Sequence, residues 1–133
     1  MDWTLEVVVV PVSDVERAIG FYRDQVGFHL DHHSTGAALN FAQLTPPGSG
    51  CSIVVGNIGR PGMTPGSLKG VQLIVADAVR ARTQLVERGV DAGEISVIDE
   101  RDGGTLFEFS DPDGNAWVVQ QISARAEKPL IPR

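Results

Sequence analysis

Two segments of the chain, one in each half, carry apolar residues at helical spacing. In the first segment these residues are Val15, Ala18, Ile19, Tyr22 and Val26, and in the second they are Ala78, Ala81 and Leu85. A spacing of three or four residues places them on one face of a helix. Gly27 and Gly89 follow the two segments and are predicted to end the helices.

The two predicted helices have different candidate N-caps. Ser13 and Glu16 have the spacing of a capping box, in which the hydroxyl accepts a bond from the helix backbone and the glutamate reaches back. The first helix is therefore expected to begin after Ser13. Asp77 is the expected N-cap of the second helix.

Runs of residues typical of β-strands lie before and after each predicted helix. One strand is expected before each helix, at residues 5–12 and 71–75. Three strands are expected after each helix, at 28–34, 38–44 and 51–56 in the first half and at 95–100, 105–110 and 116–122 in the second. The sequences Asp102-Gly103-Gly104 and Asp111-Pro112-Asp113-Gly114 are typical of turns. Each half is thus predicted to be a β-α-β-β-β module.

A short internal repeat supports this division. The sequence Val12-Ser-Asp-Val-Glu-Arg-Ala18 recurs as Val75-Ala-Asp-Ala-Val-Arg-Ala81, each copy between a predicted strand and a predicted helix. We predict a single domain over residues 1–122, with module 1 at about 4–56, a linker at 57–68 and module 2 at about 69–122. The tail, 123–133, has no periodicity and is expected to be mobile or to pack on a partner subunit.

Composition and charge narrow the class of protein. The chain has 133 residues, of which 42% are hydrophobic and 21% charged, as in ordinary globular domains. A net charge of −6 argues against a nucleic-acid partner and against an anionic membrane surface. The longest apolar run is far too short to cross a bilayer. Cys51 is the only cysteine, which excludes an intrachain disulfide, so we expect a cytoplasmic protein.

Three motifs in a fixed order carry a resemblance to a known family. They are Val12-Ser13-Asp14, then Phe21-Tyr22-Arg23-Asp24 with Gly27-Phe28, and Phe109-Ser110-Asp111-Pro112-Asp113-Gly114-Asn115. Over about residues 4–122 the chain resembles the glyoxalase, bleomycin-resistance and ring-cleaving dioxygenase (vicinal oxygen chelate) superfamily. The resemblance implies an α+β fold in which two βαβββ modules form an open, cup-like barrel around a cleft. It also implies a homodimer, but no single function, because the superfamily includes isomerases, lyases, oxygenases, epimerases and drug-binding proteins.

The resemblance also provides a test for a metal site. Catalytic members that bind a divalent metal place His, Gln or Glu at one position on each of four strands. The corresponding residues here are Val7, Ile53 (or Val54, if the register differs by one), Gly70 and Val118. None of them has a side chain that can bind a metal. We therefore expect no metal and no other cofactor.

Histidine and glutamate side chains remain as candidate bases at the cleft. His29 and His33 share one face of their predicted strand about 13 Å apart, and His32 faces the other way, so they form no metal pair unless the strand bulges. His33 or His32 could act as a base at the cleft mouth. Glu108 is a third candidate, although its two phenylalanine neighbours compete with it for the inward face.

Two glutamines are candidates for orienting a ligand. Gln72 and Gln120 are expected to share strand faces with Gly70 and Val118. The predicted ligand-binding set is Gln72, Gln120, Val7, Val9, Ile53 and Val118. Apolar walls with a few amides suit a small hydrophobic or planar organic molecule. The alternative is that the two amides bond each other or buried water in a packed core.

Three functions remain open at this point. The sequence favours metal-independent binding of a small molecule, with a homodimer as the assembly. The alternative is a lyase or isomerase acting on a small carbonyl compound, with His33, His32 or Glu108 as the base and a glutamine as the stabilising donor. A structural or regulatory domain, with its cup filled by its own side chains, is the third.

Overall fold

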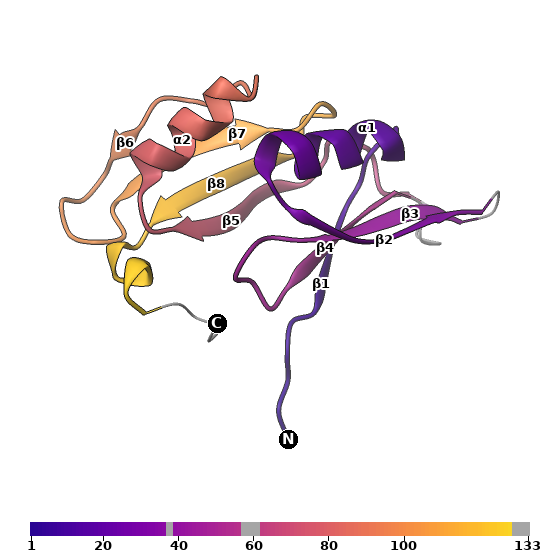
Figure 1. Ribbon diagram of the computed structural model, residues 1–133, viewed down its shortest axis with the longest axis horizontal. Helices are drawn as coiled ribbons and strands as arrows, with labels where there is room; N and C mark the ends of the chain where they lie inside the picture. Colours follow the sequence, from indigo (N-terminus) through magenta and orange to yellow (C-terminus); the bar gives the residue numbers. More distant parts are fainter. Residues whose placement is uncertain (37–38, 57–61, 129–133) are drawn as a thin grey trace.

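A computed structural model describes residues 1–36, 39–56 and 62–128 of the chain, and it contains two four-stranded sheets (Figure 1). The first sheet has the order β1-β4-β3-β2. Its strands are β1 (Val7–Val10), β2 (His29–Thr35), β3 (Asn40–Thr45) and β4 (Ser52–Gly56). Strands β1 and β4 are parallel, and the other neighbours are antiparallel.

The second sheet repeats this arrangement in the order β5-β8-β7-β6. Its strands are β5 (Lys69–Val75), β6 (Ser96–Val97), β7 (Thr105–Ser110) and β8 (Ala116–Gln121), with β5 and β8 parallel. The predicted α+β fold of two βαβββ modules is confirmed. Strand β6 is shorter than the expected 95–100 because the chain turns after Ile98, whose N–H donates to the carbonyl of Gly104 at 2.9 Å.

Each sheet carries its helix on the same side (Figure 1). Helix α1 (Val15–Ile19) continues directly into a π-helix, η1 (Gly20–Val26), and α2 is Ala78–Glu87. Both predicted glycine stops are confirmed, since Gly27 and Gly89 have φ of 99° and 84°. A 3-10 turn, η2 (Ser123–Ala126), follows β8. No helix in the described part of the chain combines the length and the hydropathy that a bilayer span needs.

The predicted capping box is wrong. Asp14 caps α1 by accepting from the backbone N–H of Arg17 at 3.0 Å. Ser13 instead donates its hydroxyl to Asp113 in the other module, at 2.6 Å. Asp77 caps α2 as predicted, with the same 3.0 Å bond from the backbone N–H of Arg80. The two caps occupy equivalent positions of the internal repeat, a signal that pointed to Asp14.

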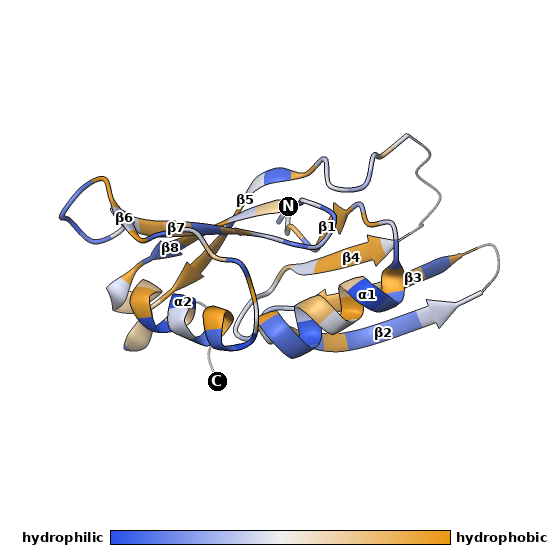
Figure 2. Ribbon diagram, turned by 90° about the horizontal axis from the view of Figure 1, so that it is seen from above, coloured by the Kyte–Doolittle hydropathy of each residue, from blue (hydrophilic) through white to orange (hydrophobic). Residues whose placement is uncertain are grey.

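The core lies between the helices and the sheets and joins the two modules. The aromatic rings of Phe21 and Tyr22 in η1, and of Phe28 two residues beyond it, pack against Phe109 and Trp117 of the second sheet. Burial of each such ring contributes about 1.5–3 kcal/mol. Figure 2 shows the consequence for the first sheet: β4, in its interior, is hydrophobic along most of its length, and β2, at its edge, is mostly hydrophilic.

Candidate functional site

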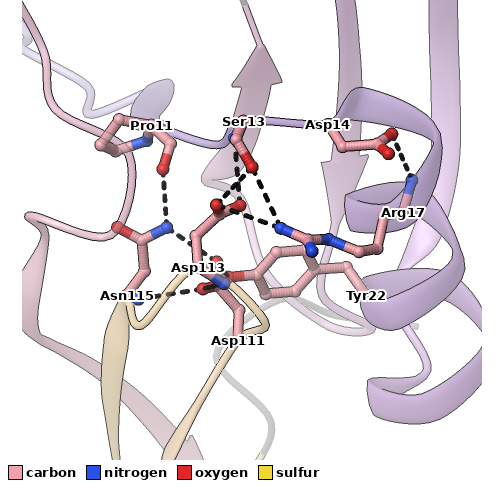
Figure 3. Close-up of polar contacts among 8 residues, drawn as sticks. All are labelled: Pro11, Ser13, Asp14, Arg17, Tyr22, Asp111, Asp113 and Asn115. Carbon is pink, nitrogen blue, oxygen red and sulfur yellow. Dashed lines mark hydrogen bonds and ion pairs between the residues drawn. The ribbon is translucent and has the colours of Figure 1, made fainter.

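A buried polar network fixes how the two modules meet (Figure 3). At its centre the Asp111 carboxylate accepts from the hydroxyl of Tyr22 at 2.7 Å and from the side-chain amide of Asn115 at 2.8 Å. That amide also donates to the carbonyl of Pro11 at 2.8 Å, and Trp117 Nε1 donates to the Tyr22 hydroxyl at 2.9 Å. Burial, reinforced by the charge of Asp111, raises the pKa of Tyr22 far above its ordinary value.

A second, more exposed group of bonds lies at the edge of this network. The Asp113 carboxylate accepts from the hydroxyl and the backbone N–H of Ser13 and from the guanidinium of Arg17. Burial acts to raise the pKa of Asp113, but the bonds from Ser13 and Arg17 together outweigh it and lower the pKa. Both groups of bonds join one module to the other, so they fix the position of the sheets. The sheet faces that point away from the helices take no part in them and remain available for function.

The side of each sheet that faces away from the helices forms what we call the open face. Strand pairing assigns the side chains, because residues opposite each other in a ladder point the same way. On the first sheet the open face includes Val7, Val9, His32, Phe41, Gln43 and Val54. On the second sheet it includes Gln72, Ile74, Leu106, Glu108, Val118 and Gln120.

Most of the predicted ligand-binding residues lie on the open faces, and one does not. Ile53 pairs with Val8 and Leu44, so it points to the helix side and is buried. The placement of Ile53 in the cleft is therefore wrong, and its neighbour Val54 takes that position. The error arises because a shift of one residue in register reverses the side to which a strand residue points.

The two predicted glutamines lie on the same open face but differ in their exposure and hydrogen bonding. Gln72 is exposed and pairs with Val118 across the β5–β8 ladder. Gln120 donates its side-chain amide to the carbonyl of Gly103 at 2.7 Å. No hydrogen bond links the two amides in the described residues. Among the residues that the structure describes, the side-chain amide of Gln72 has no hydrogen-bond partner, so its donors and acceptors can meet a ligand on this face.

A β-bulge at Asp31 rearranges the histidines. The register of β2 on β3 shifts between Leu30 and His32, so His29 shares a face with His32 rather than with His33. His33 lies on the helix side, with Nε2 3.7 Å from a carboxylate oxygen of Glu16. The placement of His33 at the cleft mouth is therefore wrong. His32 lies on the open face, with its ring centre 5.7 Å from that of Phe41.

Glu108 also lies on the open face. Its neighbours Phe107 and Phe109 take the helix side, where they are buried. Glu108 pairs with Val118 and is exposed. Two of the three candidate bases, His32 and Glu108, therefore remain on the open faces, one on each sheet.

One hollow of about 440 Å³ includes a predicted ligand-binding residue. It lies between the turn 46–49, strand β5 and the turn η2, and its polar lining includes Gln72, Ser49 and Arg125. Apolar atoms of Pro46, Pro47 and Ile74 complete its walls. Arg125 lies in the segment that the sequence predicts to be a tail, and no local pattern indicates that it would line a hollow beside β5.

The open faces do not fit a divalent metal. The positions at which catalytic relatives carry ligands hold Val7, Val54, Gly70 and Val118, none of which has a donor atom in its side chain. Over residues 1–36, 39–56 and 62–128, no three His, Cys, Asp or Glu side chains come together as a metal site would require. We therefore derive no chemistry that depends on a bound metal.

Comparisons with known proteins agree with this fold. TnmS3, an antibiotic binding protein from Streptomyces sp. CB03234, is 35% identical, with a TM-score of 0.79 over 92% of this chain and 98% of its own. A glyoxalase/bleomycin resistance protein from the same organism is 36% identical, with a TM-score of 0.76 over 89% of this chain and 100% of its own. A superfamily member from Sphaerobacter thermophilus DSM 20745 is 27% identical, with a TM-score of 0.77 over 90% and 98% of the two chains.

The family comparison covers most of the chain. A comparison with curated proteins gave no match. The family model of the Glyoxalase/Bleomycin resistance protein/Dioxygenase superfamily matches residues 4–119, a range that contains module 1, module 2 except for the end of β8, and the network between them. The chain therefore belongs to the glyoxalase/bleomycin resistance protein/dioxygenase superfamily.

Proposed function

We propose that this protein binds a small hydrophobic or planar organic molecule on its open faces, without a metal and without making or breaking bonds. The observation that carries the proposal is the chemistry of those faces. At the positions where catalytic relatives hold a metal, this chain has Val7, Val54, Gly70 and Val118. The likeness to an antibiotic binding protein that is 35% identical over 92% of this chain supports the same reading.

The side chains of the open faces suit such a ligand. Aliphatic and aromatic groups, among them Val9, Phe41 and Ile74, supply apolar area, and Gln72 supplies donors and acceptors that can orient a polar edge of the ligand. The hollow beside Gln72 has a volume in the range of small-molecule sites.

The proposal includes a homodimer, with each open face covered by a second copy of the chain. Val7 and Ile74 are each 40% exposed, and Trp3 and Leu5 in the segment before β1 are 89% and 73% exposed. Several large apolar side chains exposed close together are typical of an interface. Sedimentation equilibrium should give twice the chain mass at micromolar concentration.

We also propose a cytoplasmic location, which the single free cysteine supports.

The function is tested by measuring thermal midpoints against a library of planar aromatic, aliphatic and strongly polar compounds. Binders should raise the midpoint, with a stabilisation of about 2.7 kcal/mol at a free concentration roughly 100 times Kd. Val118→Asp places a charge on the open face and should abolish the stabilisation. Val79→Asp is the matched control, because Val79 is 59% exposed on α2, on the other side of the sheet. A library without binders, or equal effects of the two variants, would contradict the proposal.

The lyase or isomerase alternative keeps two of its candidate bases. His32 and Glu108 both lie on open faces, and His33 does not. A carbonyl substrate would need one of these groups to remove a proton and an amide such as Gln72 to stabilise the resulting oxyanion. Recovery of the bound compound after incubation separates this alternative from simple binding.

A further inference from the structure

A second hollow lies on the helix side of the second sheet and adjoins the first hollow, with which it shares Pro46, Pro47 and residues 73–75 of β5. Its volume is about 390 Å³. Phe107, Phe109 and Val119 of the second sheet line it from below, α2 forms one wall through Leu85, and Phe28 after η1 contributes to the opposite wall. Every one of these residues is buried and apolar. The floor of the hollow is therefore apolar.

Two of the residues that line the hollow have very small side chains. Ala81 stands on the wall formed by α2, and Gly27 stands where η1 ends. Gly27 has φ of 99°, a conformation that disfavours a larger residue. The side chains at these two positions are too small to fill the space between α2 and η1.

The rim of the hollow is polar and carries one positive charge. Arg88, the C-cap of α2, lines it, and its Nη1 lies 3.5 Å from the carbonyl oxygen of Gln25 and close beside Gly27. Gln84, one helical turn earlier, adds a side-chain amide to the same wall. The described residues that line the hollow include no acidic side chain.

The charge of Arg88 is not neutralised within the described part of the fold. Arg17, Arg23, Arg82 and Arg101 each have a carboxylate oxygen within 4.0 Å, whereas Arg88, like Arg80 and Arg125, has none among the described residues. The C-terminal end of α2 itself disfavours an anion, so the charge of Arg88 has to outweigh it. Backbone N–H groups of Arg88, Gly89 and Val90 already bond the last carbonyls of the helix. An unpaired guanidinium above an apolar floor is the arrangement that recognises an organic carboxylate or sulfonate.

We propose that this hollow is a second ligand site, which takes a small organic anion with a flat apolar body. The body lies on Phe107, Phe109 and Val119, and the anionic group binds the guanidinium of Arg88 with the amide of Gln84 beside it. The volume of about 390 Å³ falls in the range of small-molecule sites. The site adjoins the first hollow at β5 and the turn 46–49, but neither Gln72 nor Val118 lines it, and the proposal does not depend on the proposed function.

The test is calorimetric titration of the full chain with 2-naphthoate, with the neutral 2-naphthylmethanol as the matched probe. Arg88→Gln should weaken naphthoate binding about tenfold, as loss of a charged hydrogen bond predicts, and should change the binding of the alcohol little. Arg80→Gln removes the same charge from a residue of α2 that does not line the hollow, and it should have no effect. Ala81→Phe fills the hollow and should abolish the binding of both probes.

Measurements on the unmodified protein give an independent check. In methyl NMR spectra, 2-naphthoate should shift the signals of Leu85 and Val119 and leave that of Val79, on the exposed side of α2, unchanged. The proposal is overturned if naphthoate does not bind, if Arg88→Gln and Arg80→Gln act alike, or if the shifted signals belong to Val7 and Val118. The open-face variant Val118→Asp should leave naphthoate binding intact, so failure here is distinct from failure of the proposed function.

Discussion

The hydroxyl of Tyr22 in η1 donates a hydrogen bond to the carboxylate of Asp111 at 2.7 Å, although 89 residues separate the two in sequence. Tyr22 is fully buried, and its oxygen also accepts from Nε1 of Trp117. One side chain of module 1 thus satisfies two polar groups of module 2 inside the core. The position of each open face relative to the other therefore depends on a contact that neither module contains alone.

Tyr22→Phe keeps the ring and removes these bonds. It leaves the indole N–H of Trp117 without its partner, which costs about 1–3 kcal/mol, and removes one of the two side-chain bonds that Oδ2 of Asp111 accepts, the bond from Asn115 remaining. We expect the free energy of unfolding, from urea titration, to fall by about 2–4 kcal/mol. Arg23→Ala, in the same helix, removes only an exposed pair with Asp24 and should cost less than about 1 kcal/mol. Equal losses would contradict the role of the buried network.

Asp113 should make stability depend on pH. Its pKa is lower in the folded protein than the value of about 3.9 for an unfolded chain. The unfolded state therefore takes up a proton first, so the stabilisation is complete above about pH 5 and is lost as the pH falls through the folded pKa. Asp113→Asn should reduce the free energy of unfolding by about 1–3 kcal/mol at pH 7 and by progressively less below about pH 4. The prediction is contradicted if the difference in unfolding free energy between the unmodified protein and Asp113→Asn stays constant with pH.

The corrected cap assignment has its own test. Asp14→Ala and Asp77→Ala each remove a carboxylate that accepts a hydrogen bond from the backbone N–H three residues later. Each should therefore lower the free energy of unfolding by about 1 kcal/mol. Ser13→Ala acts instead through Asp113. In thermal melts, the loss of stability caused by Ser13→Ala should therefore be smaller in a protein that already carries Asp113→Asn. A cost of Ser13→Ala that is independent of residue 113 would restore Ser13 as the cap.

Gly66 is expected to tolerate no side chain. A Cβ there would lie 2.0 Å from the carbonyl oxygen of Asp113, and φ is +82°. Gly62 has a similar φ of +94° with no atom within 4 Å of its Cβ position, so it is the matched control. Gly66→Ala should cost about 1–3 kcal/mol more than Gly62→Ala in chemical denaturation. Similar costs would mean that backbone conformation, rather than the close approach to Asp113, sets the requirement.

The fate of the bound compound separates binding from catalysis. We expect a compound that stabilises the protein to be recovered unchanged after long incubation, as judged by mass spectrometry. Conversion that is lost in Glu108→Gln and retained in Glu100→Gln would instead favour a lyase or isomerase. Glu108 lies on the open face, whereas Glu100 is exposed in the turn after β6, which makes the pair a matched comparison.

The order of the elements, the two modules and the ends of the helices could be predicted from the sequence, because these features depend on local patterns. Apolar spacing defines a helix, and Gly27 and Gly89 end the two helices through their own conformational freedom. Asp77 caps its helix through a bond to a residue three positions away. Each of these interactions is contained within a few residues.

The composition of the open faces was decided only by the tertiary structure. The bulge at Asp31 determines which histidines share a face, and a shift of one residue exchanges Ile53 for Val54. The partner of Ser13 is Asp113, 100 residues away, which overrides a local capping pattern. Local sequence cannot fix the side of a strand or a distant partner, because both depend on how one strand or module registers against another.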